Sequence, residues 1–596
     1  MNLKNWIIKN KESIVIFLYA LLEAALIYYC LELGNKNPLL NGFFYTIVNI
    51  LTVFVIQSVI YMLARKWWIA GLVTGIPLTL LSIANYYTLI YRNSPISTQD
   101  IHNLGTTISV IDSYNFPLSV FVLGIIIFLL LQIAVVIQLF KHEKNRRTTF
   151  CRAALKTLVL ALFCSSFTYF MYFSENPIKP RNTFVWSWED SYYKFGYAAS
   201  SIEVFQNSMN MVDMPKDYSP EKLKEEQEVL SVKKTKGKTP DVILILNETF
   251  YDMRDLLDFE TDVPVMPFVD SIKTGGRAVV AGTGGGTNKS EYELLTSNSL
   301  QLMPAITPFN YLDFESANSI VSYLKALGYT TWGGHPAEEI NYKRGIVYPQ
   351  LGFDSVLFRE EFNVDGRYGQ RPYATDEGCF EKMISDYENM GDAPRFQYLL
   401  TMQNHGGWEL NPPQEDIVHS LTDFGDYTDD MDEFLSCINK TDSAFKSLTE
   451  YFENVDRDVI ICMVGDHAPS FATQLPQNIG LEETFALRST PYVIWTNFEA
   501  DLKLPSTTSM PFLVPLMLDA ADMPLSLYYS HLLTLSEKTP VLTAFNLYKT
   551  ANGDVFNYKD DSKYKREIDI YFDMVYNNSA DSKNRMEEIF KPSIKK

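Results

Sequence analysis

The distribution of hydrophobic positions divides the chain into two parts. The first 175 residues contain five long apolar stretches, whereas the later residues alternate short apolar runs with mixed ones. Each long stretch has about 20 residues, the length that an α-helix needs to cross a hydrocarbon core of about 30 Å. The sequence therefore predicts an α-helical membrane domain with five spans, at 13–33, 40–64, 68–90, 117–140 and 150–173.

The basic residues between the spans predict their orientation. They gather before the first span, after the second and around the link between the fourth and fifth, whereas the alternate connections hold only Lys36 and Arg92. Because cytoplasmic loops are enriched in Lys and Arg, we expect a cytoplasmic N-terminus and, after five crossings, an extracytoplasmic remainder. The cytoplasmic group comprises Lys4, Lys9, Lys11, Arg65, Lys66, Lys141, Lys144, Arg146, Arg147 and Arg152.

Glu23 is an ionisable residue within the first predicted span. Such a residue is costly in the hydrocarbon core and commonly marks a functional site. A role in helix packing, or a place near the membrane interface, is an equal alternative, and the sequence does not choose between these roles.

Composition narrows the classes of function. With 596 residues, the chain is long enough for a membrane region and at least one globular domain. Its net charge of −20 argues against nucleic-acid binding, which needs a basic surface. The outer part holds Cys379, Cys437 and Cys462, and an odd number at unrelated spacings is no disulfide framework. We therefore expect an ordinary hydrophobic core, with a metal ion as a further source of stability.

The segment after the membrane spans divides into three further regions. Residues 174–240 combine aromatic residues, among them Trp186 and Trp188, with a charged run, which predicts an interfacial segment and a linker. Residues 241–550 form a further predicted domain, and we assign no structure to 551–596. Strands are predicted at 241–246, 277–282, 330–333, 396–402, 458–464 and 491–496, and helices at 317–327, 377–388 and 432–452.

The strand candidates point to an α/β domain. Runs such as VILIL and VIICMV are almost continuously apolar, which is typical of strands covered on both faces of a sheet. In such domains ligands gather beyond the carboxyl ends of the strands. Several predicted strands run straight into polar or glycine residues there: Glu248, His405, the pair Asp466 and His467, and the glycine-rich loop 282–286 that leads to Thr287.

Glu248, Asp466 and His467 offer two carboxylates and an imidazole, a ligand set suited to Mn²⁺, Zn²⁺ or Mg²⁺. Thr287 would complete a four-ligand shell. Taken singly, each residue can instead cap a strand or begin a turn, but their joint position at strand ends favours a metal site.

Thr287 is a candidate nucleophile. A threonine hydroxyl is a poor nucleophile at neutral pH and needs a nearby base or a metal ion. The glycines before it allow a close backbone approach to a ligand, although they can also form a simple tight turn. A nucleotide-binding P-loop is disfavoured because Thr287 and Asn288 separate the last glycine from the lysine.

His335, Tyr342, Arg344 and His405 are candidate substrate-binding residues. Arg344 can clamp a phosphate through paired hydrogen bonds, and Tyr342 can pack against the substrate. Read alone, however, an arginine at this position is more often a surface charge than a ligand. His405 can act as an acid or base or donate to a phosphate, whereas a lone histidine is more often structural.

The motifs ILNETF, TNKSE, QNHGG and VGDHAP, behind five predicted spans, resemble the lipoteichoic acid synthase family, whose outer domain has a sulfatase or alkaline-phosphatase fold. The resemblance implies that Thr287 is the nucleophile of a Thr-x-x-Ser-Glu-aromatic pattern. It further implies metal ligands at Glu248, Asp466 and His467, typically for Mn²⁺, and substrate-binding positions at His335, Arg344 and His405. Tyr342 stands where the family has a tryptophan.

Within this family, three segments distinguish two kinds of member: GGGTNKSEYELLTSNS, KRGIVYPQLGFD and TMQNHGGW. They are more similar to the members that transfer glycerol phosphate onto cell-wall polysaccharides of Gram-positive bacteria than to the polymerising synthases. Ordinary sulfatases are disfavoured, because no Cys/Ser-x-Pro-x-Arg pattern occupies the loop. The hypothesis is a metal-dependent transfer from phosphatidylglycerol to a lipoteichoic acid chain or cell-wall polysaccharide through a phospho-threonine. The alternatives are a phosphoethanolamine transferase, a phosphodiesterase or phosphatase of the same fold, and a non-catalytic polymer-binding membrane protein.

Overall fold

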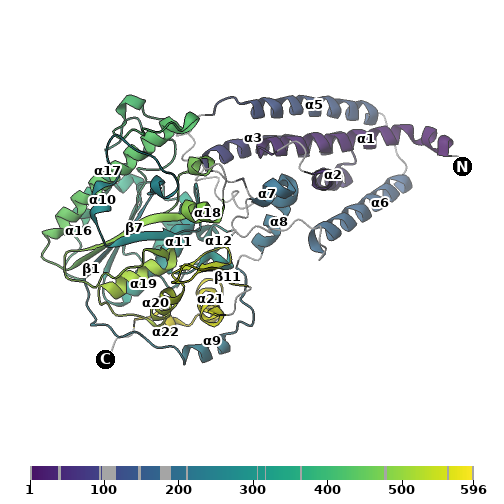
Figure 1. Ribbon diagram of the computed structural model, residues 1–596. Helices are drawn as coiled ribbons and strands as arrows, with labels where there is room; N and C mark the ends of the chain where they lie inside the picture. Colours follow the sequence, from purple (N-terminus) through teal and green to yellow (C-terminus); the bar gives the residue numbers. More distant parts are fainter. Residues whose placement is uncertain are drawn as a thin grey trace. The chain divides into compact units, whose positions relative to one another are not determined.

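The computed structural model describes residues 3–37, 42–92, 95–96, 116–144, 150–174, 190–209, 212–304, 306–315, 317–362, 366–475, 480–559 and 563–592. The described residues up to Met209 form one compact unit, and those from 212 onward form a second (Figure 1). Each unit has its own core and is described by itself.

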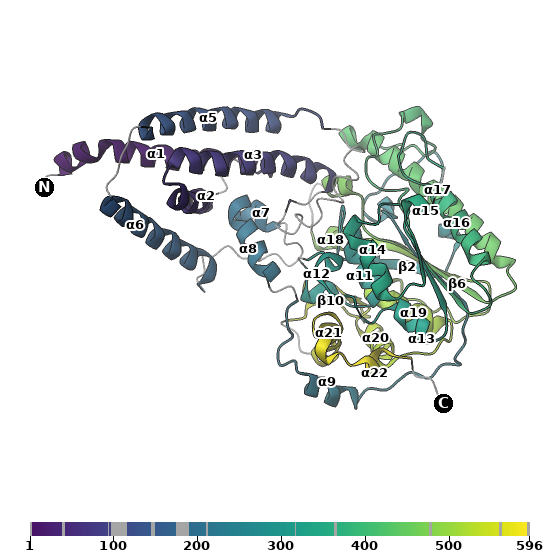
Figure 2. The same cartoon turned by 180° about the vertical axis from the view of Figure 1, so that it is seen from behind.

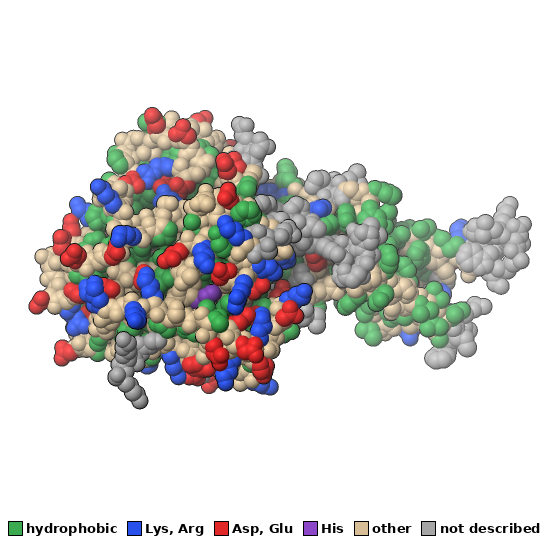
Figure 3. Space-filling model, turned by 60° about the horizontal axis from the view of Figure 1, so that its bottom comes forward, with side chains coloured by type: hydrophobic (Ala, Val, Ile, Leu, Met, Phe, Trp, Pro, Cys, Tyr) green, Lys and Arg blue, Asp and Glu red, His purple; other side chains and the backbone are tan. Residues whose placement is uncertain are grey.

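The first unit contains the five predicted membrane helices. Among the described residues they are α1 (Leu3–Gly34), α2 (Phe43–Ala64), α3 (Trp67–Arg92), α5 (Val120–Glu143) and α6 (Phe150–Thr168), which continues as a π-helical turn over Tyr169–Phe173. All five are long and apolar enough to cross a membrane. Helices α1, α3 and α5 run alongside one another (Figures 1 and 2). The space-filling view shows hydrophobic side chains over this unit, as expected of lipid-facing helices (Figure 3).

Two buried glutamates of the membrane helices accept hydrogen bonds from the first backbone N–H groups of other helices. Glu143, at the end of α5, accepts a 2.8 Å hydrogen bond from the backbone N–H of Trp67 at the start of α3. Glu32 accepts one of 2.8 Å from the N–H of Tyr197, where α8 (Tyr197–Met209) begins after α7 (Asp190–Phe195). These bonds satisfy N–H groups that a helix start leaves unpaired. The aromatic segment thus packs on the spans from Asp190 onward, while Trp186 and Trp188 lie outside the described residues.

The second unit is built on a sheet of eight strands within the described residues, in the order β4-β3-β5-β1-β6-β7-β2-β8. All neighbours pair in parallel except β7, which is antiparallel to both β6 and β2. The strands are β1 (Asp241–Asn247), β2 (Gly275–Val279), β3 (Thr330–Gly334), β4 (Ser355–Leu357), β5 (Arg395–Leu400), β6 (Val459–Gly465), β7 (Ser489–Thr496) and β8 (Thr507–Ser509). The expected α/β architecture is therefore confirmed.

Alternation along β1 explains why the sheet needs two covering layers. Val242, Leu244 and Leu246 face one hydrophobic core, whereas Ile243 and Ile245 face the other, because successive side chains of a strand point to opposite faces. The first core is filled from α11 (Thr287–Thr296), α13 (Ile320–Ala326), α14 (Arg344–Leu351), α19 (Met510–Ala520), α20 (Leu527–Lys538) and α21 (Lys565–Ser579); the second from α16 (Asp376–Glu388) and α17 (Thr428–Glu453).

The C-terminal residues, for which the sequence predicted no structure, complete the first core. Ile568, Tyr571 and Phe572 of α21 are buried in it. Before α21 the chain forms a small sheet of β9 (Val541–Leu542), β10 (Leu547–Lys549) and β11 (Val555–Asn557). The short helices of this unit are α9 (Pro220–Gln227), α10 (Pro267–Ser271), α12 (Pro308–Tyr311), α15 (Arg359–Phe362), α18 (Leu481–Leu487) and α22 (Glu587–Phe590).

Candidate active site

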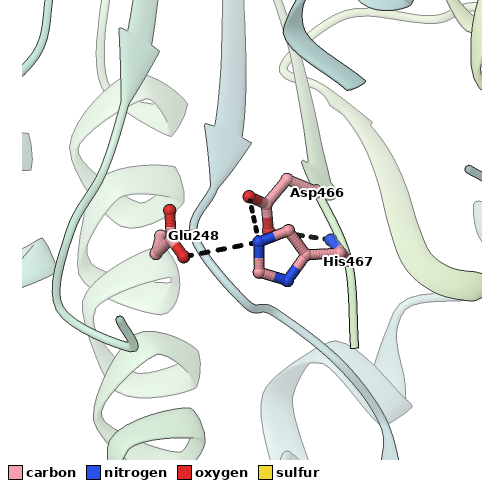
Figure 4. Close-up of side chains that lie close together, drawn as sticks. All are labelled: Glu248, Asp466 and His467. Carbon is pink, nitrogen blue, oxygen red and sulfur yellow. Dashed lines mark hydrogen bonds and ion pairs between the residues drawn. The ribbon is translucent and has the colours of Figure 1, made fainter. Parts of the chain in front are cut away.

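Glu248, Asp466 and His467 come together at one edge of the sheet. Glu248 follows β1 and the other two follow β6, and the register pairs Asn247 with Gly465, so the two strands end side by side. His467 Nε2 lies 3.2 Å from Asp466 Oδ2 and 3.7 Å from Glu248 Oε1 (Figure 4). One ligand atom from each residue lies within 4.8 Å of the others, and all three residues are buried.

The donor set of this group fits a divalent metal ion. Asp466 Oδ1 accepts bonds from the N–H groups of Thr249 (2.6 Å) and His467 (2.8 Å), whereas its buried Oδ2 has no hydrogen-bond partner among the described residues. His467 Nδ1 lies 3.0 Å from the Ala468 carbonyl oxygen. When the Nδ1–H group donates to this carbonyl, the lone pair of Nε2 faces the carboxylates. Burial, together with the neighbouring Glu248 carboxylate, raises the pKa of Asp466. A bound cation would offset the negative charge of the two carboxylates.

Thr287 presents its hydroxyl to the same group. It is the first residue of α11, and its Oγ1 lies 3.3 Å from Glu248 Oε2 and 3.4 Å from His467 Nε2. Gly286, directly before it, has φ of 95°, in the left-handed region that favours glycine. A second hydroxyl, that of Thr249, donates to Glu248 Oε1 at 2.9 Å, but Thr249 is 1% exposed. Thr287 is half-buried and so is the hydroxyl open to a ligand.

Arg344 is buried against the helix that carries Thr287. Its Nε and Nη2 donate to Glu291 Oε2 at 2.9 and 2.8 Å, and Tyr348 Oη also donates to this carboxylate. Arg344 and Glu291 are 2% and 0% exposed at their side chains. The interpretation of Arg344 as a surface charge is therefore wrong. Because Glu291 lies one helical turn after Thr287, this ion pair joins the candidate nucleophile to the candidate phosphate-binding residue.

His335 lies behind Arg344 at the end of β3. Its Nδ1 is 3.2 Å from the Leu400 carbonyl and its Nε2 is 3.3 Å from Arg344 Nη1. Donation from Nδ1 leaves Nε2 as the acceptor for the arginine. Burial and the Arg344 charge lower the pKa of His335 well below its ordinary value. The ring is therefore neutral at neutral pH, and the positive charge on this side of the site comes from Arg344.

Tyr342 lies beside Arg344 in a strained turn. Tyr342 and Lys343 have φ of 52° and 57°, a conformation that costs a non-glycine residue about 1–2 kcal/mol. The Arg344 guanidinium lies 5.0 Å from the centroid of the Tyr342 ring, within the range of a cation–π contact. Two consecutive strained residues persist only where the surroundings fix them, and here they set the ring against the arginine.

His405 occupies the loop after β5, on the other side of the site. Its Nδ1 lies 3.0 Å from Tyr373 Oη, and that hydroxyl donates to the Gly406 carbonyl at 3.1 Å. The imidazole therefore donates from Nδ1, which leaves the lone pair on Nε2. Burial, with the nearby charge of Arg371, lowers the pKa of His405 to about 4. His405 is thus a neutral imidazole at neutral pH and can accept a proton.

Arg371 fixes the His405 loop, and the sequence patterns did not single it out. Its side chain is 1% exposed and pairs with Glu433. The guanidinium also donates to the backbone carbonyls of Gln403, His405 and Gly407. Three bonds to alternate carbonyls hold the loop in one conformation. Arg371 and Tyr373 lie between elements, without periodicity, so only their closeness in the fold reveals this role.

A network of buried polar side chains connects the residues that directly precede Glu248 and His405. Asn247 Nδ2 donates to Asp376 Oδ2 at 2.7 Å, and Asn404 Nδ2 donates to Asn247 Oδ1 at 3.0 Å. Thr441 Oγ1 donates to the same Asp376 oxygen at 2.7 Å. The network ties β1, the loop after β5, α16 and α17 together. Asn247 and Asn404 directly precede Glu248 and His405, and polar residues at two buried strand ends were a usable signal.

Comparison with known proteins agrees with this architecture. The sulfatase family model matches residues 240–523. A protein of Rhizobium meliloti assigned to cyclic beta-1,2-glucan modification is 25% identical over 345 residues, which cover 56% of this chain and 53% of that protein. The capsular polysaccharide biosynthesis protein RkpI of Rhizobium meliloti is 27% identical over 251 residues, or 40% of this chain and 43% of RkpI. The chain matches about half the length of these curated relatives.

Solved structures share the fold at low identity. The phosphoglycerol transferase GacH of Streptococcus pyogenes, in complex with sn-glycerol-1-phosphate, superposes with a TM-score of 0.53 at 20% identity, over 64% of this chain and 100% of that one. The lipooligosaccharide phosphoethanolamine transferase EptA of Neisseria meningitidis gives 0.50 at 13% identity, over 85% and 95%. Residues 240–523 therefore have a sulfatase-like α/β fold, and five helices long and apolar enough to cross a membrane precede them, as the sequence predicted. The lipoteichoic acid and Gram-positive assignments find no support in the curated relatives.

Proposed function

We propose that this protein transfers glycerol phosphate from phosphatidylglycerol to a cell-envelope polymer, with Thr287 carrying the phosphoryl group between them. The observation that supports this most is the half-buried Thr287 hydroxyl, 3.3 Å from Glu248 and 3.4 Å from His467 of the buried ligand group. A hydroxyl needs such activation to act as a nucleophile. A protein that only binds a polymer has no use for it.

Glu248, Asp466, His467 and the Thr287 oxygen are the residues that would hold one divalent ion. Mn²⁺ is the first candidate, and Zn²⁺ or Mg²⁺ are alternatives for the same oxygen and nitrogen donors. When bound, the ion would stabilise negative charge on the threonine oxygen and on the phosphate.

In the first half-reaction, Thr287 Oγ1 loses its proton and bonds to the phosphorus of the lipid. The bond from phosphorus to the diacylglycerol oxygen breaks, this oxygen takes up a proton, and a glycerophosphoryl group remains on Thr287. In the second, an acceptor hydroxyl loses its proton and bonds to phosphorus while the Thr287 oxygen leaves and is protonated. No oxidation and no nucleotide is needed.

His405 fits the proton transfers of both steps. Its neutral imidazole, with the Nε2 lone pair available, can take the proton of the acceptor hydroxyl. Within each half-reaction the imidazole can take the proton of the attacking hydroxyl and pass it to the oxygen that leaves phosphorus, so it is neutral again at the end of the step. Arg344 would offset charge on the phosphate oxygens that remain unbonded, while His335 and Tyr342 hold its guanidinium in position.

Charge around the substrate side favours a neutral head group over ethanolamine. The buried glutamates next to these residues, Glu291 and Glu433, are each paired with an arginine. The rings of Tyr342 and Tyr373 already lie near the arginines 344 and 371. An ammonium group is bound by carboxylates or open aromatic faces. Among the described residues, the hydrogen-bond and ring partners of Arg344 and His405 include no unpaired carboxylate and no tyrosine ring without an arginine beside it. Hydroxyl groups of glycerol need only hydrogen-bond partners.

A polysaccharide acceptor is consistent with the names of the relatives, which refer to glucan modification and capsular polysaccharide. Lipoteichoic acid stays a second acceptor to test. Membrane helices would keep the site near its lipid donor. In this proposal the N-terminus is cytoplasmic and the catalytic unit extracytoplasmic, where a phosphate transfer between hydroxyls can proceed without nucleotides.

The test is mass spectrometry of the full-length protein after incubation with phosphatidylglycerol and Mn²⁺, with diacylglycerol release followed in parallel. We expect a glycerophosphate adduct on the peptide that carries Thr287, and its loss when an acceptor polysaccharide is added. Thr287→Ala abolishes the adduct. Thr283→Ala, in the same glycine-rich loop, keeps it and serves as the matched control.

Other outcomes identify the alternatives. An adduct formed only from phosphatidylethanolamine would show a phosphoethanolamine transferase, and release of free glycerol phosphate without acceptor would show a phosphodiesterase. Absence of both adduct and diacylglycerol from either lipid, with metal bound at one equivalent, would contradict a catalytic role and leave a polymer-binding protein.

A further inference from the structure

The membrane unit holds a buried carboxyl group that the proposed transfer does not use. Glu23 lies near the middle of the candidate span Asn10–Gly34 and is 1% exposed. Both of its side-chain oxygens are buried without a hydrogen-bond partner among the described residues. The interfacial alternative for Glu23 is therefore wrong, and the question becomes what satisfies this carboxyl group.

Glycines of α3 make the space around Glu23. A Cβ atom added at Gly71 would lie 3.5 Å from Glu23 Cγ, and one added at Gly75 would lie 3.3 Å from Glu23 Oε1. The same position at Gly75 is 2.8 Å from Gln132 Oε1 of α5. Two side-chain oxygens from different helices thus face one notch, at the place where α1, α3 and α5 pack together.

Gln132 is held with its oxygen toward this notch. Its Nε2 lies 3.2 Å from both Cys30 Sγ and Thr79 Oγ1, which take its amide protons. The Thr79 hydroxyl is also 3.3 Å from Gln132 Oε1, and a carbonyl oxygen retains a second acceptor site. An ionised Glu23 would therefore put two acceptors opposite each other with no hydrogen between them.

Among the described residues, the groups that line the notch with Glu23 do not offer a compensating charge. From α1 the notch is lined by Ile27, and from α5 by Gln132 and Val136, beside the two glycines of α3. The titratable member of the adjoining cluster is the Cys30 thiol, itself bonded to Gln132. A carboxylate buried in hydrocarbon without a cation or donor is strongly disfavoured, and it escapes by taking up a proton.

We propose that Glu23 is a protonated carboxylic acid and that, with Gln132 across the Gly75 notch, it forms a proton-binding site inside the membrane unit. The ligand is a proton, which converts the carboxylate to an acid able to donate toward Gln132 Oε1 directly or through one water. Loss of the proton would leave a negative charge between α1, α3 and α5, so proton occupancy is coupled to the packing of these helices. The membrane unit is then more than an anchor.

The test uses the full-length protein in lipid nanodiscs without substrate, so its result is independent of the transfer reaction. Dicyclohexylcarbodiimide reacts with protonated carboxyl groups in apolar surroundings, and mass spectrometry locates the product. We expect labelling of Glu23 at neutral pH that declines as the pH is raised. Glu12 on the same helix, 61% exposed at its side chain beside His142, stays unlabelled, and Glu23→Gln removes the label from this helix.

Two alanine variants separate the site from general packing. Gly75→Ala fills the notch and lowers the label yield. Gly124→Ala, whose added methyl would meet only the apolar end of Leu33 at 3.0 Å, leaves it unchanged. Protection of Glu23 by Na⁺ at constant ionic strength would overturn the proposal in favour of a cation site. Absence of label on Glu23 in the folded protein would overturn it as well, because the carboxyl would then be ionised.

Discussion

Glu291→Gln tests whether the buried ion pair behind Thr287 has the structural role that its geometry indicates. In the native protein the Glu291 carboxylate accepts bonds from Arg344 and Tyr348 and is fully buried. The substitution leaves the Arg344 charge buried without a counter-charge, a change that typically costs 3–5 kcal/mol, so we expect a loss of about that size. The matched control is Glu338→Gln, which breaks an ion pair on the surface. The side chains of Glu338 and Arg359 are 41% and 50% exposed, so the free energy of unfolding should fall by less than about 1 kcal/mol.

A double variant distinguishes a stabilising role from a functional one. Glu291→Met with Arg344→Met removes both charges, and apolar replacements of a buried pair are often close to neutral. The Tyr348 hydroxyl loses its partner, which costs about 1–3 kcal/mol. The double variant should therefore be more stable than Glu291→Gln. Its transfer rate should nevertheless fall by about 10²–10³, the usual loss for a missing group that stabilises transition-state charge.

The assay is equilibrium unfolding of the full-length protein in guanidinium chloride, followed by tryptophan fluorescence, with transfer from phosphatidylglycerol measured on the same preparations. The free energies of unfolding can be compared if the variants and the native protein show the same dependence of this free energy on denaturant concentration. The reasoning is refuted if Glu291→Gln destabilises no more than Glu338→Gln, or if the double variant is the less stable of the two. Full activity of the double variant would remove Arg344 from the phosphate site while leaving its structural role intact.

Four further predictions concern the rest of the site. Burial lowers the pKa of His405 to about 4 from 6.5, so the base stays neutral until the pH falls to that range; the acid limb of kcat should lie near 4, and a limb near 6.5 would contradict the assignment. Tyr373→Phe should lower kcat by about 10–100-fold, as loss of a supporting hydrogen bond commonly does, with KM for the lipid unchanged; a change confined to KM would speak against this role. A chelator should abolish transfer and lower the unfolding temperature, because an ion bound to the native state stabilises it, and Mn²⁺ should restore both; full activity of metal-free protein would exclude the metal. Gly286→Ala and Gly391→Ala, at φ of 95° and 77°, should each cost about 1–2 kcal/mol, but only the first should slow transfer, and equal activities would show that the Gly286 turn does not orient Thr287.

The elements that the sequence predicted best are those whose pattern is local. The expected strand 241–246 and helix 377–388 correspond to β1 and α16 within one residue at each end. Strands β4 and β8 were missed because three residues are too few to show an alternation. The direction of β7 could not be predicted from its own residues either. Residues 491–496 have the pattern of an apolar strand, and only the pairing with β6 and β2 in the structure shows that the strand is antiparallel.

The same distinction explains which parts of the site the sequence could identify. Glu248, Asp466 and Thr287 follow parallel strands, and parallel strands place their carboxyl ends at one edge, so topology alone brings these residues together. Arg371 and Glu433 are separated by 62 residues and meet through the packing of a loop on α17, which no local pattern encodes. Of these five residues, the sequence could identify the three that the sheet places, and it missed the two that hold the His405 loop in position. Because a buried arginine gains its charge partner only in the folded chain, substitutions in this second group should affect stability and catalysis together, whereas Thr287→Ala should affect catalysis alone.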